Sequence, residues 1–149
     1  MKHTHIYDQE YITYYDKYFE YIEEVKYKFP KKLYDFATDH NRYLLNTQGT
    51  LHDAKINRIN IDICSNNKYL ELFLLTKWRD SEIYIKYYNL RNFDSKIFST
   101  EYPNAKFDLL THEITCLEMN VYQHLIKFEH GLWLMVQFSD IEVKELSVE

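Results

Sequence analysis

The stretch YQHLIKFEHGLWLMVQF, residues 122–138, decides the fold of this chain. Large apolar residues recur at every second position on both sides of His130-Gly131, and a period of two is typical of half-buried strands. A glycine beside a polar residue between two such runs favours a short turn. We therefore expect strands over residues 122–129 and 132–138 that pair as an antiparallel hairpin.

Further segments continue this strand pattern on both sides of the hairpin. Apolar residues alternate with polar ones over residues 59–63, 70–74, 83–87, 110–116 and 141–143. Short polar connections between successive segments imply antiparallel pairing. Residues 91–106 break the pattern, and we expect irregular chain there with a short helical turn near residues 94–98.

The N-terminal third carries the period of a helix instead. One apolar stripe has alternating spacings of four and three, and it consists of Tyr11, Tyr15, Tyr18, Ile22, Val25 and Phe29. Pro30 ends this helix, predicted over residues 8–29, and begins a second one over residues 31–46. We expect a single α+β domain, 1–149, with two N-terminal helices packed on an antiparallel sheet of about six strands over residues 54–146.

Composition excludes several classes of protein. The chain has 149 residues and only two glycines, Gly49 and Gly131, whereas a P-loop, a Rossmann turn and a nucleophile elbow all need glycines at fixed spacing. The sequence has no apolar run near the roughly 20 residues of a membrane span, and its first residues lack the apolar stretch that is typical of a signal peptide. We expect a cytoplasmic protein in which Cys64 and Cys116 are reduced core residues, unless their Cα atoms lie close enough for a disulfide.

Charge is unevenly distributed along the chain. The net charge is −5, and residues 101–149 hold nine acidic and three basic side chains. Because phosphate contacts need Lys and Arg, this third argues against a nucleic-acid-binding surface. An acidic third is compatible with a basic protein partner, or with a surface that is merely soluble.

Three histidines are candidates for chemistry. His112 and His124 fall on strands expected to pair, and they could bind a metal with His52 or Asp53 as a third ligand. Exposed or hydrogen-bonded strand histidines are the alternative. His52 could also act as a general base oriented by a carboxylate. In the structural interpretation, Leu51 anchors this Leu-His-Asp motif in the core and Asp53 accepts backbone N–H groups at the turn.

The order of elements, with Leu51, His52 and Asp53 leading into the first strand, resembles that of small bacterial α+β domains similar to immunity proteins of toxin systems. The C-terminal residues that carry the resemblance are His124, Ile126, Phe128, Gly131, Phe138 and Asp140. The resemblance covers residues 51–146. It implies an immunity protein that neutralises a cognate toxin domain in the cytoplasm. We expect no catalytic residue, metal or cofactor, and neither nucleic acid nor membrane as a partner.

If the toxin is a basic nuclease, acidic side chains would steer its association and cover its active site. The candidate partner-binding residues are Glu113, Glu118, Glu129, Asp140, Glu142, Glu145, Trp78 and Trp133. An aromatic patch on the sheet could anchor the partner or pack beneath the helices or the loop over residues 91–106, and it comprises Trp78, Tyr84, Tyr87, Tyr88 and Trp133. The alternatives are an enzyme or metal-binding domain that uses the sheet histidines, and a homo-oligomeric structural or adaptor protein.

Overall fold

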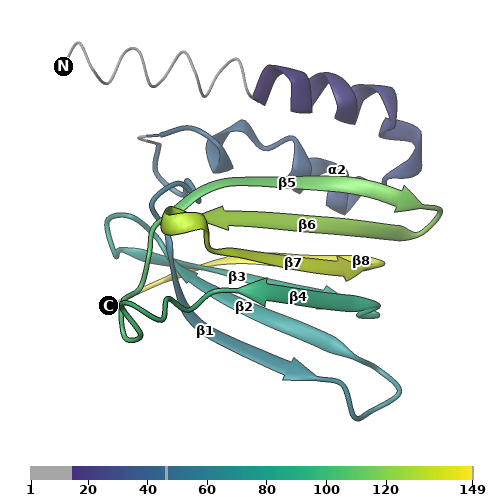
Figure 1. The fold of residues 1–149 in the computed structure, drawn as a ribbon. Coiled ribbons are helices and arrows are strands. Elements are labelled where there is room, and N and C mark those ends of the chain that lie inside the picture. Colours follow the sequence, from purple (N-terminus) through teal and green to yellow (C-terminus); the bar gives the residue numbers. More distant parts are fainter. Residues whose placement is uncertain (1–14, 46, 149) are drawn as a thin grey trace.

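The computed structural model describes residues 15–45 and 47–148, and these residues form two antiparallel four-stranded sheets (Figure 1). The strands are β1 (Lys55–Asp62), β2 (Tyr69–Leu75), β3 (Ser81–Tyr88), β4 (Asn92–Lys96), β5 (Leu109–Glu118), β6 (Val121–Phe128), β7 (Trp133–Phe138) and β8 (Asp140–Ser147). The first sheet has the order β1-β2-β3-β8, and the second has the order β4-β7-β6-β5. The α+β class is confirmed, but the prediction of one sheet of about six strands is wrong.

One bent ribbon of paired strands joins the two sheets. β3 pairs with β8 in the first sheet, and β4 pairs with β7 in the second. Between these pairs, Ser139 N–H donates to the Tyr88 carbonyl (3.2 Å) and Arg91 N–H donates to the Gln137 carbonyl (2.9 Å). The pairing therefore continues through the bend, where Asn89 has a φ of 52°. A single ribbon leaves one sheet and enters the other.

The prediction for residues 91–106 is wrong where β4 lies. Phe93 is the one half-buried residue of β4, and the rest of the strand is exposed. The sequence of β4 therefore lacks the alternation that marks the other strands. Its pairing with β7 makes it a strand, and that pairing is a tertiary contact.

The helices are shorter than predicted. The described helical elements are a helix over residues 15–24, η1 (Lys26–Lys28), α2 (Lys31–Ala37), η2 (His40–Arg42) and η3 (Glu129–Gly131). Residues 8–14 of the predicted first helix lie outside the described residues. After α2, the Thr38 hydroxyl donates to the Tyr34 carbonyl (2.7 Å) and the Asp39 carboxylate accepts from Asn41 N–H (3.1 Å). Such local bonds compete with helical ones and end the second helix early.

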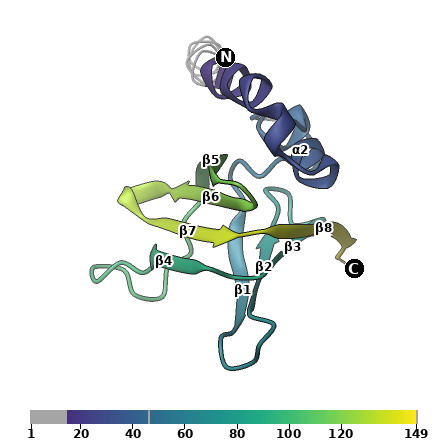
Figure 2. The ribbon, with the colours of Figure 1, turned by 90° about the vertical axis from the view of Figure 1, so that its right-hand side faces the viewer.

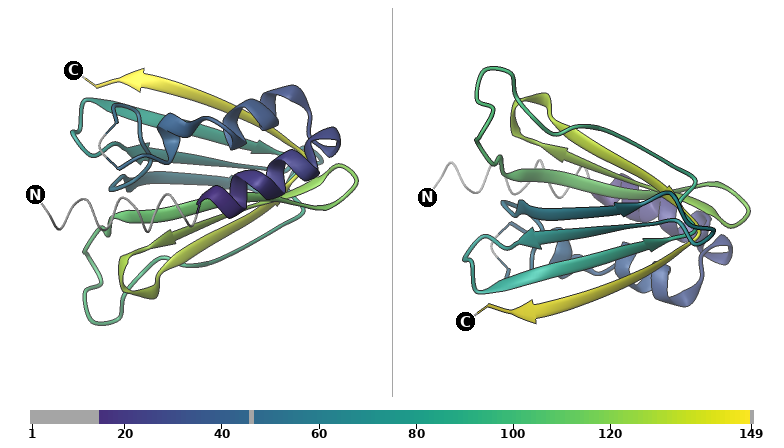
Figure 3. Two further views of the ribbon diagram at one scale, coloured as in Figure 1. Left: turned by 90° about the horizontal axis from the view of Figure 1, so that it is seen from above. Right: turned by 90° about the horizontal axis from the view of Figure 1, so that it is seen from below.

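Both helices lie on one side of the molecule, over one edge of each sheet (Figure 3). α2 packs against β8, and its buried residues join the core between the sheets. The helix over residues 15–24 lies along β5. The other two edges, β1 and β4, are on the opposite side. Within the described ranges, the chain has no helix long and apolar enough to cross a membrane.

The first helix lies beside the outer edge of β5 (Figure 2), and its tyrosine hydroxyls accept hydrogen bonds from N–H groups of that edge. Alternate N–H groups of β5 donate to these hydroxyls: Ile114 to Tyr18 (3.1 Å), Cys116 to Tyr21 (2.9 Å) and His112 to Tyr15 (3.4 Å). An uncovered edge strand leaves such N–H groups without a protein partner and open to aggregation. The tyrosine-rich stripe thus both fills the core and closes a sheet edge.

Candidate functional site

The two sheet histidines lie side by side in the core, on one face of the second sheet, and their strands pair as predicted. Both side chains are buried. The Tyr87 hydroxyl oxygen lies 2.6 Å from His124 Nδ1, and His124 Nε2 lies 3.0 Å from His112 Nδ1. His112 Nε2 in turn lies 3.3 Å from the carbonyl oxygen of Arg42. The four groups form one continuous hydrogen-bonded chain across the core.

The carbonyl of Arg42 fixes every proton in this chain. A carbonyl only accepts, so His112 carries its proton on Nε2 and accepts from His124 at Nδ1. His124 then carries its proton on Nε2 and accepts from the Tyr87 hydroxyl at Nδ1. Burial lowers the pKa of His112 to about 3 and that of His124 well below its usual value, so both rings are neutral at neutral pH.

This chain of bonds leaves no ring nitrogen of either histidine for a metal. The predicted third ligands, His52 and Asp53, lie near the start of β1. In the part of the chain that the structure describes, no three His, Cys, Asp or Glu side chains are grouped to hold a metal ion. The histidine pair is therefore a satisfied polar network that ties the second sheet to β3 and η2.

The Leu-His-Asp motif ties the turn before β1 to the start of β5. Leu51 is fully buried, as predicted. His52 Nδ1 lies 3.2 Å from the carbonyl oxygen of Leu110, and His52 Nε2 lies 3.3 Å from Asp53 Oδ1. Lys77 Nζ lies 3.4 Å from Asp53 Oδ2. The imidazole of His52 does contact a carboxylate, but its two ring nitrogens contact the Leu110 carbonyl and the Asp53 carboxylate, which are both parts of the fold. The Asp53 carboxylate contacts the side chains of His52 and Lys77 rather than N–H groups of the turn.

The six acidic candidates lie on several surfaces. Glu113 is on the outer face of the second sheet, Glu118 at the end of β5, Glu129 in η3, Asp140 and Glu142 on the outer face of the first sheet, and Glu145 on the inner side of β8. Glu129 accepts from Asp108 N–H (2.9 Å), and Glu145 accepts from the Ser81 hydroxyl (3.2 Å). Asp140 and Glu142 are the two acidic candidates that share a surface.

The predicted aromatic patch is split among four places. Tyr87 is buried in the core, and Trp78 lies in the β2–β3 turn with 48% of its surface exposed. Trp133 lies on the outer face of the second sheet, where it lines a shallow apolar hollow with Leu125 and Met135. Only Tyr84 and Tyr88 lie together, on the outer face of the first sheet.

A larger cluster, which the sequence pattern did not predict, surrounds these two tyrosines. Strand register places the following residues on one outer surface, which we call the aromatic face: Arg58, Tyr69, Glu71, Phe73, Tyr84, Lys86, Tyr88, Asp140, Glu142 and Lys144. The signal was present as alternation in β2 and β3. The cluster could not be recognised from this signal, because the more polar side of a strand is typical of a solvent-exposed face unless the residues on the neighbouring strand are known.

Hydrogen bonds and ring contacts hold the aromatic face in one arrangement. Tyr84 donates to Glu71 (2.5 Å) and Tyr88 donates to Glu142 (2.7 Å). The Phe73 and Tyr84 rings are 5.0 Å apart, and the Arg58 guanidinium lies 4.0 Å above the Phe73 ring.

Lys86 completes the arrangement, because its ammonium lies 4.4 Å from the centre of the Tyr69 ring and 4.9 Å from that of Tyr88. The hydrogen bond to Glu142 raises the pKa of Tyr88 to about 12. The bonds from Lys144 and Tyr88 lower the pKa of Glu142. Glu142 is therefore held as a carboxylate beside a neutral phenol.

Both cysteines are free. Cys116 is half-buried on β5, but Cys64 is exposed just after β1, so the expectation of a core residue is wrong there. The Asp62 carboxylate accepts from Cys64 N–H (3.1 Å) and Ser65 N–H (3.3 Å), which makes this segment a polar turn. The alternation of Ile59 and Ile61 extended the predicted strand one residue too far, to Ile63.

The aromatic face and the histidine network are thus defined by the geometry of this chain alone. Comparison with protein-family models, curated proteins and solved structures finds no significant match.

Proposed function

We propose that this protein is an immunity protein that binds a cognate bacterial toxin domain through its aromatic face. The observation that carries the proposal is the preordered cluster of tyrosines and carboxylates on the first sheet, which includes Asp140 and Glu142. The resemblance of residues 51–146 to immunity-protein-like domains supports the choice of a toxin as the partner.

The composition of the aromatic face suits a protein interface. Tyr and Arg are enriched among the residues that carry most binding energy. The face offers half-buried Tyr69, Tyr84 and Tyr88 around the buried ring of Phe73. The buried residues of α2 pack into the core instead, so this helix leaves the outer surface open.

The side chains of the aromatic face are already held in one conformation, which favours tight binding. A partner that meets mobile side chains loses about 0.5–1.5 kcal/mol for each one that it immobilises. Here Glu71 and Glu142 are already held by Tyr84 and Tyr88. Their carboxylates can accept from Lys or Arg side chains of a partner without first being ordered.

The charge of the chain favours a basic partner. The net charge is −5, and such a charge accelerates encounter with a positive surface. Glu142 and Asp140 lie on the outer face of the first sheet, where an approaching domain can reach them. On the aromatic face itself, Glu71, Asp140 and Glu142 are the groups that would meet the cations of a basic nuclease domain, beside the three cations Arg58, Lys86 and Lys144.

Growth rescue tests the proposal directly. The protein is co-expressed with the C-terminal domain encoded by the gene immediately upstream, and surviving cells are counted. We expect rescue together with co-purification of the two proteins. A toxic neighbour that is neither bound nor neutralised would refute the immunity function.

Matched charge reversals test the binding face. Glu142→Lys and Glu118→Lys change the net charge equally, but only Glu142 lies on the aromatic face. We expect Glu142→Lys to slow association with the toxin about tenfold at low salt and Glu118→Lys to change it less than about twofold. Equal effects of the two variants would contradict the assigned face. Loss of binding in Trp133→Ala alone would move the interface to the second sheet.

A further inference from the structure

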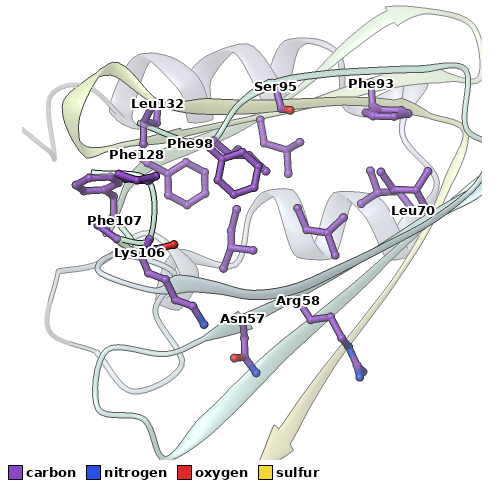
Figure 4. A pocket seen from close by; sticks show the side chains of 18 residues that line it. Asn57, Arg58, Leu70, Phe93, Ser95, Phe98, Lys106, Phe107, Phe128 and Leu132 are labelled. Carbon is purple, nitrogen blue, oxygen red and sulfur yellow. The ribbon is translucent and has the colours of Figure 1, made fainter. Parts of the chain in front are cut away.

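A cavity of about 500 Å³ lies between the two sheets, on the side away from the helices (Figure 4). It opens between the edge strands β1 and β4, and the segment over residues 97–107 closes one end. Its volume falls in the range of pockets that hold small organic ligands. The cavity is separate from the aromatic face, which is on the outer side of the first sheet.

The topology explains why this space stays unfilled. The helices cover β5 and β8, the other edge of each sheet, and their apolar side chains complete the core there. No described element fills the corresponding gap between β1 and β4. A register shift between Ile56 and Arg58 adds a bulge to β1 at this position, and bulges bend an edge strand away from its neighbours.

The walls of the cavity are apolar. Leu70, Phe128 and Leu134 form its buried inner wall, while Ile61, Phe98 and Phe107 stand nearer solvent. Phe98 is 73% exposed and Ile61 is 43% exposed. Figure 4 shows the rings of Phe98, Phe107 and Phe128 gathered at one end of the cavity. A ligand that covers these side chains would remove a continuous apolar surface from water.

The charged residues that line the cavity are both cationic, Arg58 and Lys106. Arg58 is committed elsewhere, because its guanidinium stacks on Phe73 at the aromatic face. Nearby carboxylates are also engaged, since Glu82 accepts from the side-chain amide of Asn57 (2.7 Å) and Asp108 pairs with Lys55. Lys106 is exposed and has no ion-pair partner among residues 15–45 and 47–148. Its ammonium is therefore available to an anionic group at the mouth (Figure 4).

We propose that this cavity binds a single-chain amphiphile with an anionic headgroup, of the fatty-carboxylate class. The alkyl chain lies along Leu70, Phe128 and Leu134, between the sheets, and the carboxylate meets the ammonium of Lys106 at the mouth. The apolar walls supply affinity, and the one available cation selects the sign of the headgroup.

Isothermal titration calorimetry with two probes of equal chain length tests the ligand class. Laurate and dodecyltrimethylammonium are titrated into the full chain below their micelle concentrations. We expect one saturable site for laurate and a dissociation constant about five- to tenfold higher for the cationic probe. Equal affinity for both probes would overturn the assigned headgroup. Absence of saturable binding by either probe would overturn the site.

Two pairs of variants locate the site. Ile61→Trp replaces an aliphatic side chain with a larger aromatic one at the cavity mouth. It should weaken laurate binding at least about tenfold, because the indole displaces methylene groups of the laurate chain from the cavity. Ile63→Trp, at an exposed position that does not line the cavity, should leave binding unchanged. Lys106→Gln should weaken laurate binding about two- to fivefold, whereas Lys17→Gln on the first helix removes the same charge without effect.

Methyl NMR of the unsubstituted protein gives a result that does not depend on variant folding. Laurate should shift the methyl signals of Ile61, Leu70 and Leu134, and it should leave those of Leu125 on the outer face of the second sheet in place. Shifts centred on Leu125 instead would place the apolar ligand in the hollow beside Trp133 and would contradict the proposal.

Discussion

His124 Nε2 lies 3.0 Å from His112 Nδ1 in the core, and this contact couples two strands to β3 and to η2. Both imidazoles are neutral, and each ring nitrogen has a defined role as donor or acceptor. A buried polar network with every group satisfied favours one packing arrangement over its alternatives.

The histidine network makes the fold sensitive to acid. Below the unfolded-state pKa of about 6.5, the unfolded chain binds a proton at His112 that the folded protein does not bind until pH falls to about 3. The histidine contribution to stability is therefore complete above about pH 6.5 and is lost as pH falls toward 3. We expect His112 alone to reduce the free energy of unfolding by about 3 kcal/mol between pH 7 and pH 4.5, measured by urea denaturation.

His112→Gln provides the control for this pH effect, because the amide does not titrate and can still donate to the carbonyl of Arg42. The variant should be less stable at pH 7 but should lose less stability on acidification than the unsubstituted protein. An identical pH dependence of the two proteins would show that other groups cause the acid sensitivity.

The Tyr87 hydroxyl is the donor that ends the chain of hydrogen bonds. Tyr87→Phe keeps the ring and leaves His124 Nδ1 without its donor, so we expect a loss of about 1–3 kcal/mol in the free energy of unfolding. Tyr27→Phe removes a hydroxyl from a side chain that is 81% exposed and should change stability by less than about 0.5 kcal/mol. Equal unfolding midpoints for the two variants would be inconsistent with the hydrogen bond from Tyr87 to His124.

The tyrosines of the first helix protect the edge of β5. Tyr21→Phe removes the acceptor of Cys116 N–H, so we expect that amide to exchange with solvent about five- to tenfold faster. The amide of Ile114, whose acceptor is Tyr18, serves as the internal control and should change little. Hydrogen exchange followed by NMR measures both amides at once, and uniform acceleration along β5 would point to general loosening of the strand instead.

A side chain would destabilise the protein by different amounts at the two glycines. Both have positive φ, 79° for Gly49 and 72° for Gly131, so Ala at either position is strained by about 1–2 kcal/mol. A Cβ at Gly49 would also lie 2.9 Å from Arg42 Nη1, which donates to the Gly49 carbonyl (2.7 Å). We expect Gly49→Ala to destabilise the protein by about 1 kcal/mol more than Gly131→Ala, which meets no atom within 4 Å. Chemical denaturation of both variants measures the difference, and equal losses would show that Arg42 moves aside without cost.

Most strand positions could be predicted because those strands bury one side. The period of two in β2, β3, β6 and β7 is a local property, and the structure places strands there. β4 could not be predicted, because its side chains are mostly exposed and only pairing with β7 defines it. The second helix was overestimated because the bonds made by Thr38 and Asp39 interrupt an apolar pattern that continues through Tyr43.

The candidate site was less predictable than the strands. Asp140 and Glu142 could be identified from their charge, but their bonding environment depends on Tyr88 and on the register between β3 and β8. The cavity was not predictable at all. It exists because β1 and β4 are edges of different sheets, and a sequence pattern does not show where one sheet ends.

By itself, the sequence determined most of the strand and helix segments, β4 excepted, and which side of each is apolar, because these depend on side chains two to four residues apart. Only the tertiary structure decided that the strands form two sheets, that Tyr87, His124 and His112 form one chain of bonds, and that a cavity remains open beside β1. These features depend on contacts between residues far apart in the sequence, and the free energy of those contacts is set by packing and register rather than by local pattern.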